Sequence, residues 1–410
     1  MNPLISAGSP HNLAALPDAA DLAARRIEIH DLTLEGDCEE MAGMFLGANA
    51  RLEIARHLDA MGVPRLSVLG NSPRPTEAEI ASARAIANLG LNARLSSFVK
   101  TSGEIDLTAQ IGLEGTIILI GVNARFFPPG RDIDAVIEEA CQMARRARGL
   151  GLHTSLMAMD SSRAAEEDVY RFVLACEDLV DEFVICDSMG VASPWGFERL
   201  VKKVRGWTQH PLQVHCHNHT GMGVANALAA VRAGADIVHT CVNGWGEFAG
   251  QPALDEVAVA LEMHLGTSSG LRLKGLTELA QIVADAAGLD LPANKPVTGR
   301  AAFAIPETEE IQEAFGLCAA MGTLDAALTF PPALVGNRAQ MSMGRKCSRH
   351  TITYALARRG LTASDDVKYQ IAAVVRATAA AANGYYLLPE KVFDALLASG
   401  AFEVTPVIDR

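Results

Sequence analysis

The feature that most constrains the fold of this chain is a regular alternation of short apolar runs with longer helical patterns. Eight short apolar runs, starting near Arg26, predict eight β-strands: Ile27–Leu32, Leu66–Leu69, Ala93–Val99, Thr116–Val122, Thr154–Met159, Phe183–Cys186, Gln213–His217 and Ile237–Val242. Between most of these runs, apolar residues recur every three or four positions, as they do in amphipathic helices. Eight strand–helix units in succession are typical of a parallel (β/α)8 TIM barrel, an α/β fold.

Seven helices are predicted among the strands: Ala50–Ala60, Glu77–Leu89, Ile133–Leu150, Ala164–Asp178, Pro194–Val204, Val224–Ala233 and Leu254–Leu265. An open, doubly wound sheet is the alternative architecture, but no Gly-x-Gly-x-x-Gly follows the first strand, which disfavours it. Hydrophobic residues make up 49% of the chain and aromatic residues only 5%, so the core is expected to be aliphatic. Such a core suits helices packed on a parallel sheet.

The pattern divides the 410 residues into three parts. Residues 1–25 are rich in Ala, Pro, Ser and Asn and predict a flexible N-terminal arm, and residues 26–266 are expected to form the barrel. Residues 267–410 predict a mostly helical accessory region, because helical patterns follow one another there without intervening strands. Its expected helices are Leu276–Ala287, Thr308–Phe315, Ser348–Arg359, Asp365–Ala382 and Pro389–Ala398, joined by linkers at Asn294–Phe303 and Thr329–Lys346.

Charge and cysteine usage restrict the partners and the compartment. The formal net charge is −13, which repels phosphate backbones and anionic lipid and argues against nucleic-acid or membrane partners. No apolar run reaches the length of a transmembrane helix, and no secretory leader is evident in residues 1–25. The eight cysteines are scattered, without a Cys-x-x-Cys pair. Buried, reduced thiols in a cytoplasmic protein are therefore expected.

The strongest chemical signal lies at the end of the seventh predicted strand, where three histidines alternate. His215, His217 and His219 share one face of a strand, since side chains alternate along it. In a barrel that face is the interior, and two imidazoles at positions i and i+2 can chelate one metal ion. Hydrogen-bonded core histidines are the alternative explanation. His219 is open to three roles: a third ligand, a proton carrier or a contact for a lid.

Two further loops carry oxygen donors. After the eighth strand, a Gly-rich turn contains Gly246, Glu247 and Gln251, which suit a ligand site or simply a tight turn. After the first strand, acidic residues crowd one short loop, which is either a source of a metal-binding carboxylate or a solvated acidic loop. These are Asp31, Glu35, Asp37, Glu39 and Glu40.

Several motifs together resemble the metal-dependent aldol/Claisen barrel superfamily. This superfamily includes isopropylmalate, homocitrate and citramalate synthases and hydroxymethylglutaryl-CoA lyase, and the resemblance runs over about residues 26–400. The motifs are Val214-His215-Cys216-His217-Asn218, Asn243-Gly244-Trp245-Gly246-Glu247, Cys186-Asp187-Ser188-Met189-Gly190 and, in the accessory region, Asn294-Lys295-Pro296-Val297-Thr298-Gly299. A barrel followed by this linker is similar to the synthase branch without its terminal regulatory domain.

The resemblance implies a metal site and also shows where this chain departs from its relatives. It implies that Asp37, His215, His217 and Gln251 are the metal ligands, with Asp37 reached only if one residue is inserted. The synthases have an arginine after Asp-x-Thr-Leu, and here Glu35 stands in its place. Gln251 replaces an asparagine, and Ile305 replaces a catalytic histidine of the accessory region. Losing a preorganised cation beside a developing oxyanion costs on the order of 3 kcal/mol.

Three residues can supply a replacement cation. Lys100 follows the third strand, Arg125 the fourth and Arg163 the fifth. Each is otherwise an ordinary surface charge. Catalytic roles are expected for Glu35, Lys100, Asp160, Ser188 and His219, and substrate-binding roles for Arg125, Arg163, Gly246 and Glu247.

Three functional hypotheses follow. The favoured one is an enzyme that makes or breaks a carbon–carbon bond next to a carbonyl of a 2-oxo or 2-hydroxy acid, on a substrate unlike that of the leucine pathway. The second is a hydrolase, decarboxylase or hydratase that uses a metal-bound water, with Glu35 or His219 as base. The third is a non-catalytic relative that binds a metal or metabolite.

The resemblance also implies cofactors and partners. The oxygen-rich ligand set favours Mg or Mn, and His219 leaves Zn, Co or Fe open. Acyl-CoA is an implied co-substrate beside a small carboxylic acid. A homodimer is expected, since synthases of this type usually pair.

Overall fold

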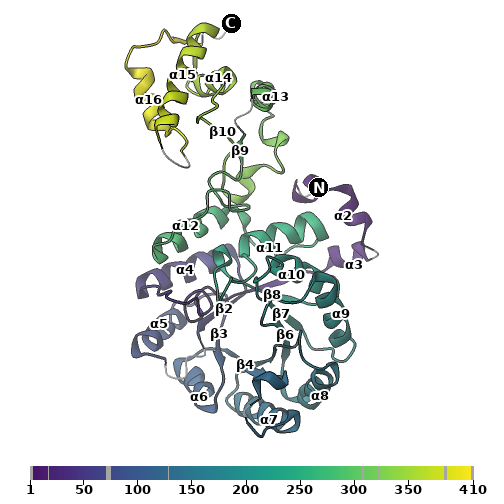
Figure 1. The fold of residues 1–410 in the computed structure, drawn as a ribbon. Coiled ribbons are helices and arrows are strands. Elements are labelled where there is room, and N and C mark those ends of the chain that lie inside the picture. Colours follow the sequence, from purple (N-terminus) through teal and green to yellow (C-terminus); the bar gives the residue numbers. More distant parts are fainter. Residues whose placement is uncertain are drawn as a thin grey trace. The chain divides into compact units, whose positions relative to one another are not determined.

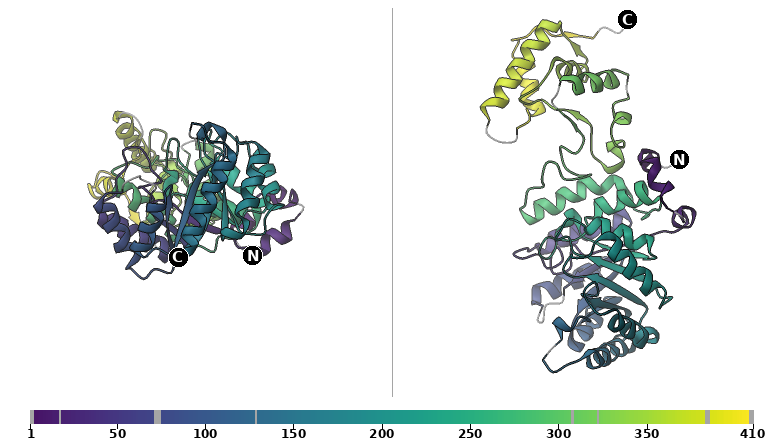
Figure 2. Two further views of the ribbon diagram at one scale, coloured as in Figure 1. Left: turned by 90° about the horizontal axis from the view of Figure 1, so that it is seen from below. Right: turned by 45° about the vertical axis from the view of Figure 1, so that its right-hand side comes forward.

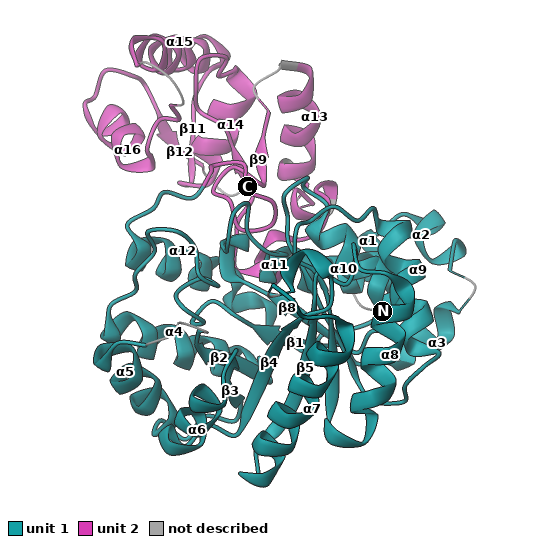
Figure 3. Ribbon diagram, turned by 60° about the horizontal axis from the view of Figure 1, so that its bottom comes forward, with its two compact units in different colours: residues 1–291 teal, residues 292–410 magenta. Residues whose placement is uncertain are grey.

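The chain folds into two compact units, residues 1–291 and residues 292–410 (Figure 3). The computed structural model describes residues 3–16, 18–70, 75–127, 129–306, 309–321, 323–382 and 386–407. Met1, Asn2 and Pro17 of the expected arm, and Thr308 at the start of an expected helix, lie outside these residues.

The first unit is built on a closed barrel of eight parallel strands in sequential order (Figure 1). Strand β1 pairs with both β2 and β8, which closes the ring. The expected (β/α)8 fold is therefore confirmed. The strands are β1 (Glu28–Asp31), β2 (Arg65–Leu69), β3 (Arg94–Val99), β4 (Gly115–Gly121), β5 (His153–Met159), β6 (Glu182–Asp187), β7 (Leu212–Cys216) and β8 (Ile237–Thr240).

Helices connect the strands and cover the outside of the barrel (Figure 1). They are α4 (Ala48–Met61), α5 (Glu77–Ala87), α6 (Ser102–Ile111), α7 (Ile133–Gly149), α8 (Glu166–Cys176), α9 (Pro194–Arg205), α10 (Gly223–Arg232) and α11 (Leu254–Ala260), which continues as a π-helical turn, η4 (Leu261–Leu265). Helix α6 was not predicted from the sequence, because its apolar positions are few. Its signal was a capping box, in which Thr101 and Glu104 bond each other's backbone N–H groups.

The N-terminal segment differs from the flexible arm that the sequence suggested. It forms three short helices, α1 (Pro3–Ala7), α2 (Pro10–Ala14) and α3 (Ala19–Ala24), drawn in purple in Figures 1 and 2. Leu4 and Leu22 are buried, and the Asn12 amide lies 2.9 Å from Nδ1 of His264 in η4. These contacts dock the segment on the side of the barrel. These helices could not be predicted from composition, because the few apolar residues are spread over three short turns.

The first unit also extends beyond the boundary expected after Gly266. Helix α12 (Leu276–Ala287) buries one apolar face, which includes Leu279 and Val283. The side chain of Asn243, in the loop after β8, donates a hydrogen bond of 3.0 Å to the carbonyl of Ala280. This helix therefore belongs with the barrel, and the unit runs to Leu291.

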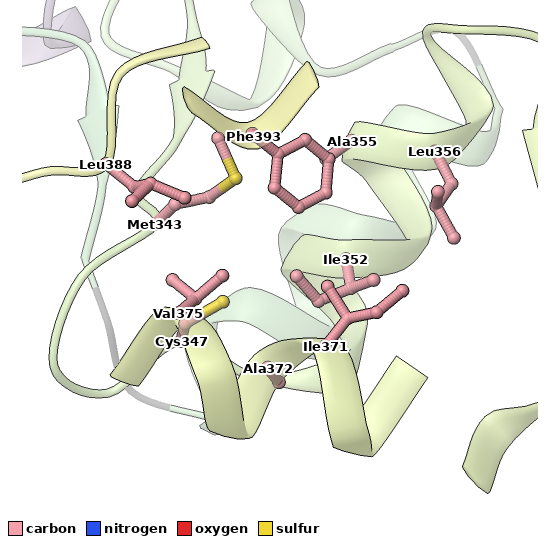
Figure 4. Packing of buried hydrophobic residues seen from close by; sticks show 10 residues of the cluster. All are labelled: Met343, Cys347, Ile352, Ala355, Leu356, Ile371, Ala372, Val375, Leu388 and Phe393. Carbon is pink, nitrogen blue, oxygen red and sulfur yellow. The ribbon is translucent and has the colours of Figure 1, made fainter. Parts of the chain in front are cut away.

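The second unit is mostly helical, as expected, and adds short strand pairs. Its helices are α13 (Glu309–Ala320), α14 (Arg349–Ala357), α15 (Asp365–Ala381) and α16 (Glu390–Ala398). Strands β9 (Ala304–Ile305) and β10 (Gln340–Met341) pair in parallel, and β11 (Leu361–Thr362) pairs with β12 (Thr405–Pro406) in antiparallel fashion. Phe393 of α16 packs with Ile352, Ile371 and Val375 in a separate apolar core (Figure 4).

Inside the barrel, apolar and polar side chains lie in different layers. One cluster is apolar and consists of Leu32, Phe98, Ile117, Leu119, Met157, Val184, Cys186 and Cys241. The polar layer contains His30, Gln213 and His239, all buried and hydrogen-bonded. No helix in the described part of the chain is long and apolar enough to cross a membrane.

Candidate metal centre

Two buried imidazoles meet at the C-terminal end of β7. His215 is the fourth residue of the strand and His217 follows its end. Their Nε2 atoms lie 3.2 Å apart. Burial lowers the pKa of each ring to about 4, so both are neutral at neutral pH. Neutral imidazoles are the form that binds metal ions.

A buried carboxylate completes this group. Oε1 of Glu39, from the loop after β1, lies 3.3 Å from Nε2 of His215 and 3.7 Å from Nε2 of His217. The three ligand atoms all lie within 4.8 Å of one another. Burial raises the pKa of Glu39, because an ionised carboxylate between neutral rings lacks water. A cation bound among the three groups would offset this cost.

Gln251 adds a fourth donor. Its Nε2 lies 3.0 Å from Nε2 of His215 and 3.3 Å from Nε2 of His217. Its Oε1 is buried and has no hydrogen-bond partner among the described residues. The two ends of a carboxamide exchange places by rotation about the last side-chain bond. The orphaned oxygen can therefore face the imidazoles, and two nitrogens with two oxygens fit a divalent transition-metal ion.

Asp37, the carboxylate expected among the ligands, lies elsewhere. It forms a buried ion pair with Nη1 of Arg51 on α4 and accepts a 2.7 Å hydrogen bond from the backbone N–H of Leu46. Arg51 also donates to the carbonyls of Leu34 and Val68. Asp37 thus anchors the loop to α4, and Glu39 is the carboxylate beside the histidines.

The backbone conformation of this loop explains why Glu39, and not Asp37, lies beside the histidines. Five consecutive residues, from Gly36 to Glu40, have φ between 47° and 61° and form a left-handed turn. This conformation costs roughly 1–2 kcal/mol for each non-glycine residue. The strain is offset by the Asp37 ion pair and by the backbone N–H of Glu247, which donates 2.9 Å hydrogen bonds to both the carbonyl and Oε2 of Glu39. Strain of this kind often accompanies a functional site.

The glycine-rich loop after β8 makes room for this carboxylate. A Cβ on Gly246 would lie 2.6 Å from Oε2 of Glu39 and 3.0 Å from Cγ of Gln251. A side chain at this position would displace the Glu39 carboxylate, so Gly246 leaves room for it in the site. Burial, together with the charges of Glu39 and Glu40, raises the pKa of Glu247 to about 7, and Lys100 opposes this shift.

A second group of expected residues gathers after β5 and β6. Asp160 is fully buried and binds Arg163 through paired hydrogen bonds of 2.8 Å, from Nε to Oδ1 and from Nη2 to Oδ2. Asn123, which the sequence analysis did not single out, donates a 2.7 Å hydrogen bond to Asp160. The backbone N–H of Asp160 donates to Oγ of Ser188 at 2.9 Å. Arg163 is thus neutralised by its partner.

The remaining expected residues lie farther apart. Lys100 after β3 and Arg125 after β4 are exposed. Glu35 is buried next to Gly70, at the end of β2. His219 is exposed beyond the strand, and its ring lies 5.0 Å from that of Phe248. Its ring centroid lies 5.9 Å from that of His217, but it is not among the three grouped ligand residues.

Comparison with known proteins agrees with this architecture. Residues 26–283 match the family model described as HMGL-like. A putative (R)-citramalate synthase of Archaeoglobus fulgidus is 30% identical over 86% of this chain and 71% of its own length. Homocitrate synthase 1 of Nostoc sp. is 32% identical over 86% of this chain and 92% of its own length.

The chain belongs to the HMGL-like family. The resemblance expected from the motifs is thereby confirmed. Because the relatives are synthases, the expected enzyme class, an acyltransferase or carbon–carbon lyase, is confirmed as well. Among solved structures, the HMG-CoA lyase of Bacillus subtilis superposes with a TM-score of 0.59 over 65% of this chain and 96% of the lyase. At 15% identity, this likeness shows a shared fold.

Proposed function

We propose that this HMGL-like protein is a divalent-metal-dependent enzyme that makes or breaks a carbon–carbon bond next to the carbonyl of a 2-oxo or 2-hydroxy acid. The observation that carries the proposal is the convergence of Glu39, His215 and His217, with the carboxamide of Gln251 beside both imidazoles. They meet at the C-terminal end of the barrel strands, where barrel enzymes have their active sites.

A bound divalent ion would act as a Lewis acid that polarises the carbonyl of the substrate. The two imidazoles, the Glu39 carboxylate and the Gln251 amide oxygen would hold the ion. The charge of the set is −1, contributed by Glu39 alone, so a divalent ion keeps a net positive charge. That charge favours an anionic substrate such as a 2-oxo carboxylate.

The chain's own residues must also supply the cation that the synthases' arginine provides. Arg163 is a poor candidate because Asp160 already binds its guanidinium in a bidentate way. Lys100 is the better one, since its side chain is exposed directly after β3. Its charge also acts on Glu247, beside Glu39. We infer that Lys100 attracts the substrate's carboxylate.

Proton transfer has a separate candidate. Asp160 accepts hydrogen bonds from Arg163 and Asn123, so its carboxylate fixes the loops that follow β4 and β5. His219 is exposed at the rim, where its ring faces Phe248. An imidazole in that place can exchange protons with both water and substrate. We infer that His219 is the general acid–base group.

We infer acyl-CoA as the co-substrate, which the likeness to citramalate and homocitrate synthases supports. Mn2+-loaded protein should therefore release free thiol from acetyl-CoA with at least one member of a panel of 2-oxo acids. His217→Ala, which removes a ligand, should lose this release. His210→Ala, just before the start of β7 and outside the ligand set, should retain it. Absence of release, and of cleavage of the corresponding 2-hydroxy acid thioesters, in metal-loaded protein would contradict the proposal.

One observation favours a second function. Glu35, where the synthases have their arginine, is buried close to the metal-binding loop. A carboxylate there opposes an oxyanion but suits the activation of water, as in a hydrolase, decarboxylase or hydratase. Loss of CO2 or of an acyl group from the 2-oxo acid panel without any thiol release would favour this function.

A further inference from the structure

A chain of buried hydrogen bonds runs from the candidate metal centre through the barrel interior to Glu182, the first residue of β6. Nδ1 of His215 lies 3.1 Å from Nδ1 of His239 on β8. Nε2 of His239 lies 2.7 Å from Oε1 of Gln213, and Nε2 of Gln213 lies 2.6 Å from Oε2 of Glu182. All four side chains are at least 97% buried. The ligand set described above does not account for this chain.

The direction of every proton in this chain follows from chemistry. A carboxylate only accepts hydrogen bonds, so the Gln213 amide donates to Glu182 and presents its oxygen to His239. His239 must then donate from Nε2 and accept at Nδ1. His215 in turn donates from Nδ1, which leaves its Nε2 with a free lone pair. That is the atom that lies 3.2 Å from Nε2 of His217 and 3.3 Å from Glu39.

The far end of the chain is a fixed acceptor. Glu182 accepts two hydrogen bonds of 2.8 Å from Nη1 of Arg65, and Arg65 also binds Glu28. Although burial opposes it, the His153 ring and the charge of Arg65 lower the pKa of Glu182 to about 2. The carboxylate is therefore ionised across the working pH range. A permanent acceptor keeps the Gln213 amide, and everything above it, in one orientation.

Two roles are compatible with a buried chain of this kind. It could carry protons between the buried carboxylate at its far end and the metal centre, or it could hold the ligand in place. A carboxamide gives up its N–H proton reluctantly, so Gln213 interrupts proton transfer. We propose that His239 and Gln213 are positioning residues that hold His215 in the tautomer whose Nε2 lone pair faces Glu39 and His217, where a metal ion would bind. Such outer partners commonly change metal affinity 10–100-fold.

The barrel offers a matched control for this role. His30 on β1 pairs in register with His239 on β8. It is equally buried and its Nδ1 lies 3.1 Å from the same oxygen of Gln213. Its Nε2, however, contacts Ser67 and Ser96 and not a metal ligand. A substitution at His30 therefore disturbs the same polar layer without touching His215.

The inference rests on the proposed metal site and is tested by metal binding. Co2+ affinity is measured by competition with a chromophoric chelator for wild type, His239→Phe, His239→Gln and His30→Phe, with the visible spectrum of each Co2+ form. We expect His239→Phe to bind roughly 10–100-fold more weakly with an altered spectrum. His239→Gln, whose amide oxygen can accept from His215, should recover most of the affinity. His30→Phe should stay within about twofold of wild type.

A second variant keeps the inference testable if His239→Phe does not fold. Gln213→Met retains the His239 ring but removes its acceptor, and should weaken Co2+ binding roughly tenfold. Wild-type affinity in the His239 and Gln213 variants, or an equal loss in His30→Phe, would overturn the positioning role while the metal site stands. Absence of Co2+ binding by the wild type would overturn the proposed function itself.

Discussion

Asp37 and Glu39 lie two positions apart in the sequence but have different surroundings. Glu39 lies beside the histidines, whereas Asp37 points to Arg51. Asp37→Asn and Glu39→Gln each replace a carboxylate by an amide of the same shape. Asp37 lies in a buried ion pair with Arg51, whose side chain is 5% exposed. Glu39 contacts His215 and His217. The first substitution should therefore affect stability, and the second should affect metal binding.

The magnitudes follow from the contacts. Removing one partner of a buried ion pair costs about 3–5 kcal/mol, because the other charge stays buried without compensation. Burial raises the pKa of Asp37 even though Arg51 opposes this, so the attraction does not repay desolvation in full. We therefore expect Asp37→Asn to lower the free energy of unfolding by about 3 kcal/mol. Removing the one charged ligand in Glu39→Gln should weaken divalent-ion binding at least about 100-fold, on the order of 3 kcal/mol.

Two assays separate the effects. Urea denaturation followed by tryptophan fluorescence reports the first unit, since Trp195, Trp207 and Trp245 all belong to it. Chelator competition with Mn2+ reports the metal site. Asp37→Asn should lower the free energy of unfolding of the metal-free protein and keep its Mn2+ affinity within a fewfold. A loss of Mn2+ affinity in Asp37→Asn with none in Glu39→Gln would refute this assignment.

Three further outcomes are expected. Burial lowers the pKa of His30 to about 3, so between about pH 6.5 and pH 3 only the unfolded chain takes up this proton, and the folded state loses stability as the pH falls. His30→Gln should therefore remove about 2 kcal/mol of the stability loss between pH 7 and pH 5, measured by urea denaturation in chelator. An unchanged pH slope would count against this. Lys100→Met should lower kcat/KM for the 2-oxo acid roughly tenfold and Lys100→Arg should restore it, in the thiol-release assay; equal rates in all three proteins would exclude Lys100 as the substrate's cation. Phe393→Ala should destabilise the second unit by about 3–5 kcal/mol in calorimetry and leave Mn2+ affinity unchanged; an unaltered melting profile would show that the cluster in Figure 4 contributes little.

Much of the fold was predictable because the signal repeats. Each of the eight apolar runs became a barrel strand, shifted by one or two residues at its ends. The helix α6 was missed because its core face has few apolar residues. The N-terminal helices were missed because isolated turns of five or six residues are marginal by themselves and depend on tertiary contacts, such as that between Asn12 and His264.

The site was predictable where strand geometry dictates it. His215 and His217 follow from the two-residue alternation of β7, and Gln251 follows from the motif after β8. The carboxylate was not predictable, because a left-handed turn through Asp37, Cys38, Glu39 and Glu40 has no local signature beyond Gly36. Sequence alone placed several acidic residues in one loop. Only the packing against Arg51 shows which of them turns away from the histidines.

The hydrogen-bonded polar layer inside the barrel also could not be predicted from the sequence. His30, Gln213 and His239 come from strands far apart in the chain, and their hydrogen bonds depend on the register across the closed ring. The alternation pattern predicts that they point inward. It does not predict that they form one directed chain that ends at Glu182.

The central claim is that a divalent ion binds between β7 and the loops after β1 and β8. The most direct measurement is anomalous diffraction at the manganese edge from crystals soaked in Mn2+. One strong peak is expected within coordination distance of Nε2 of His215, a nitrogen of His217, the Glu39 carboxylate and Oε1 of Gln251. A peak bound instead by Asp37, or no peak at the histidines under saturating Mn2+, would contradict this claim.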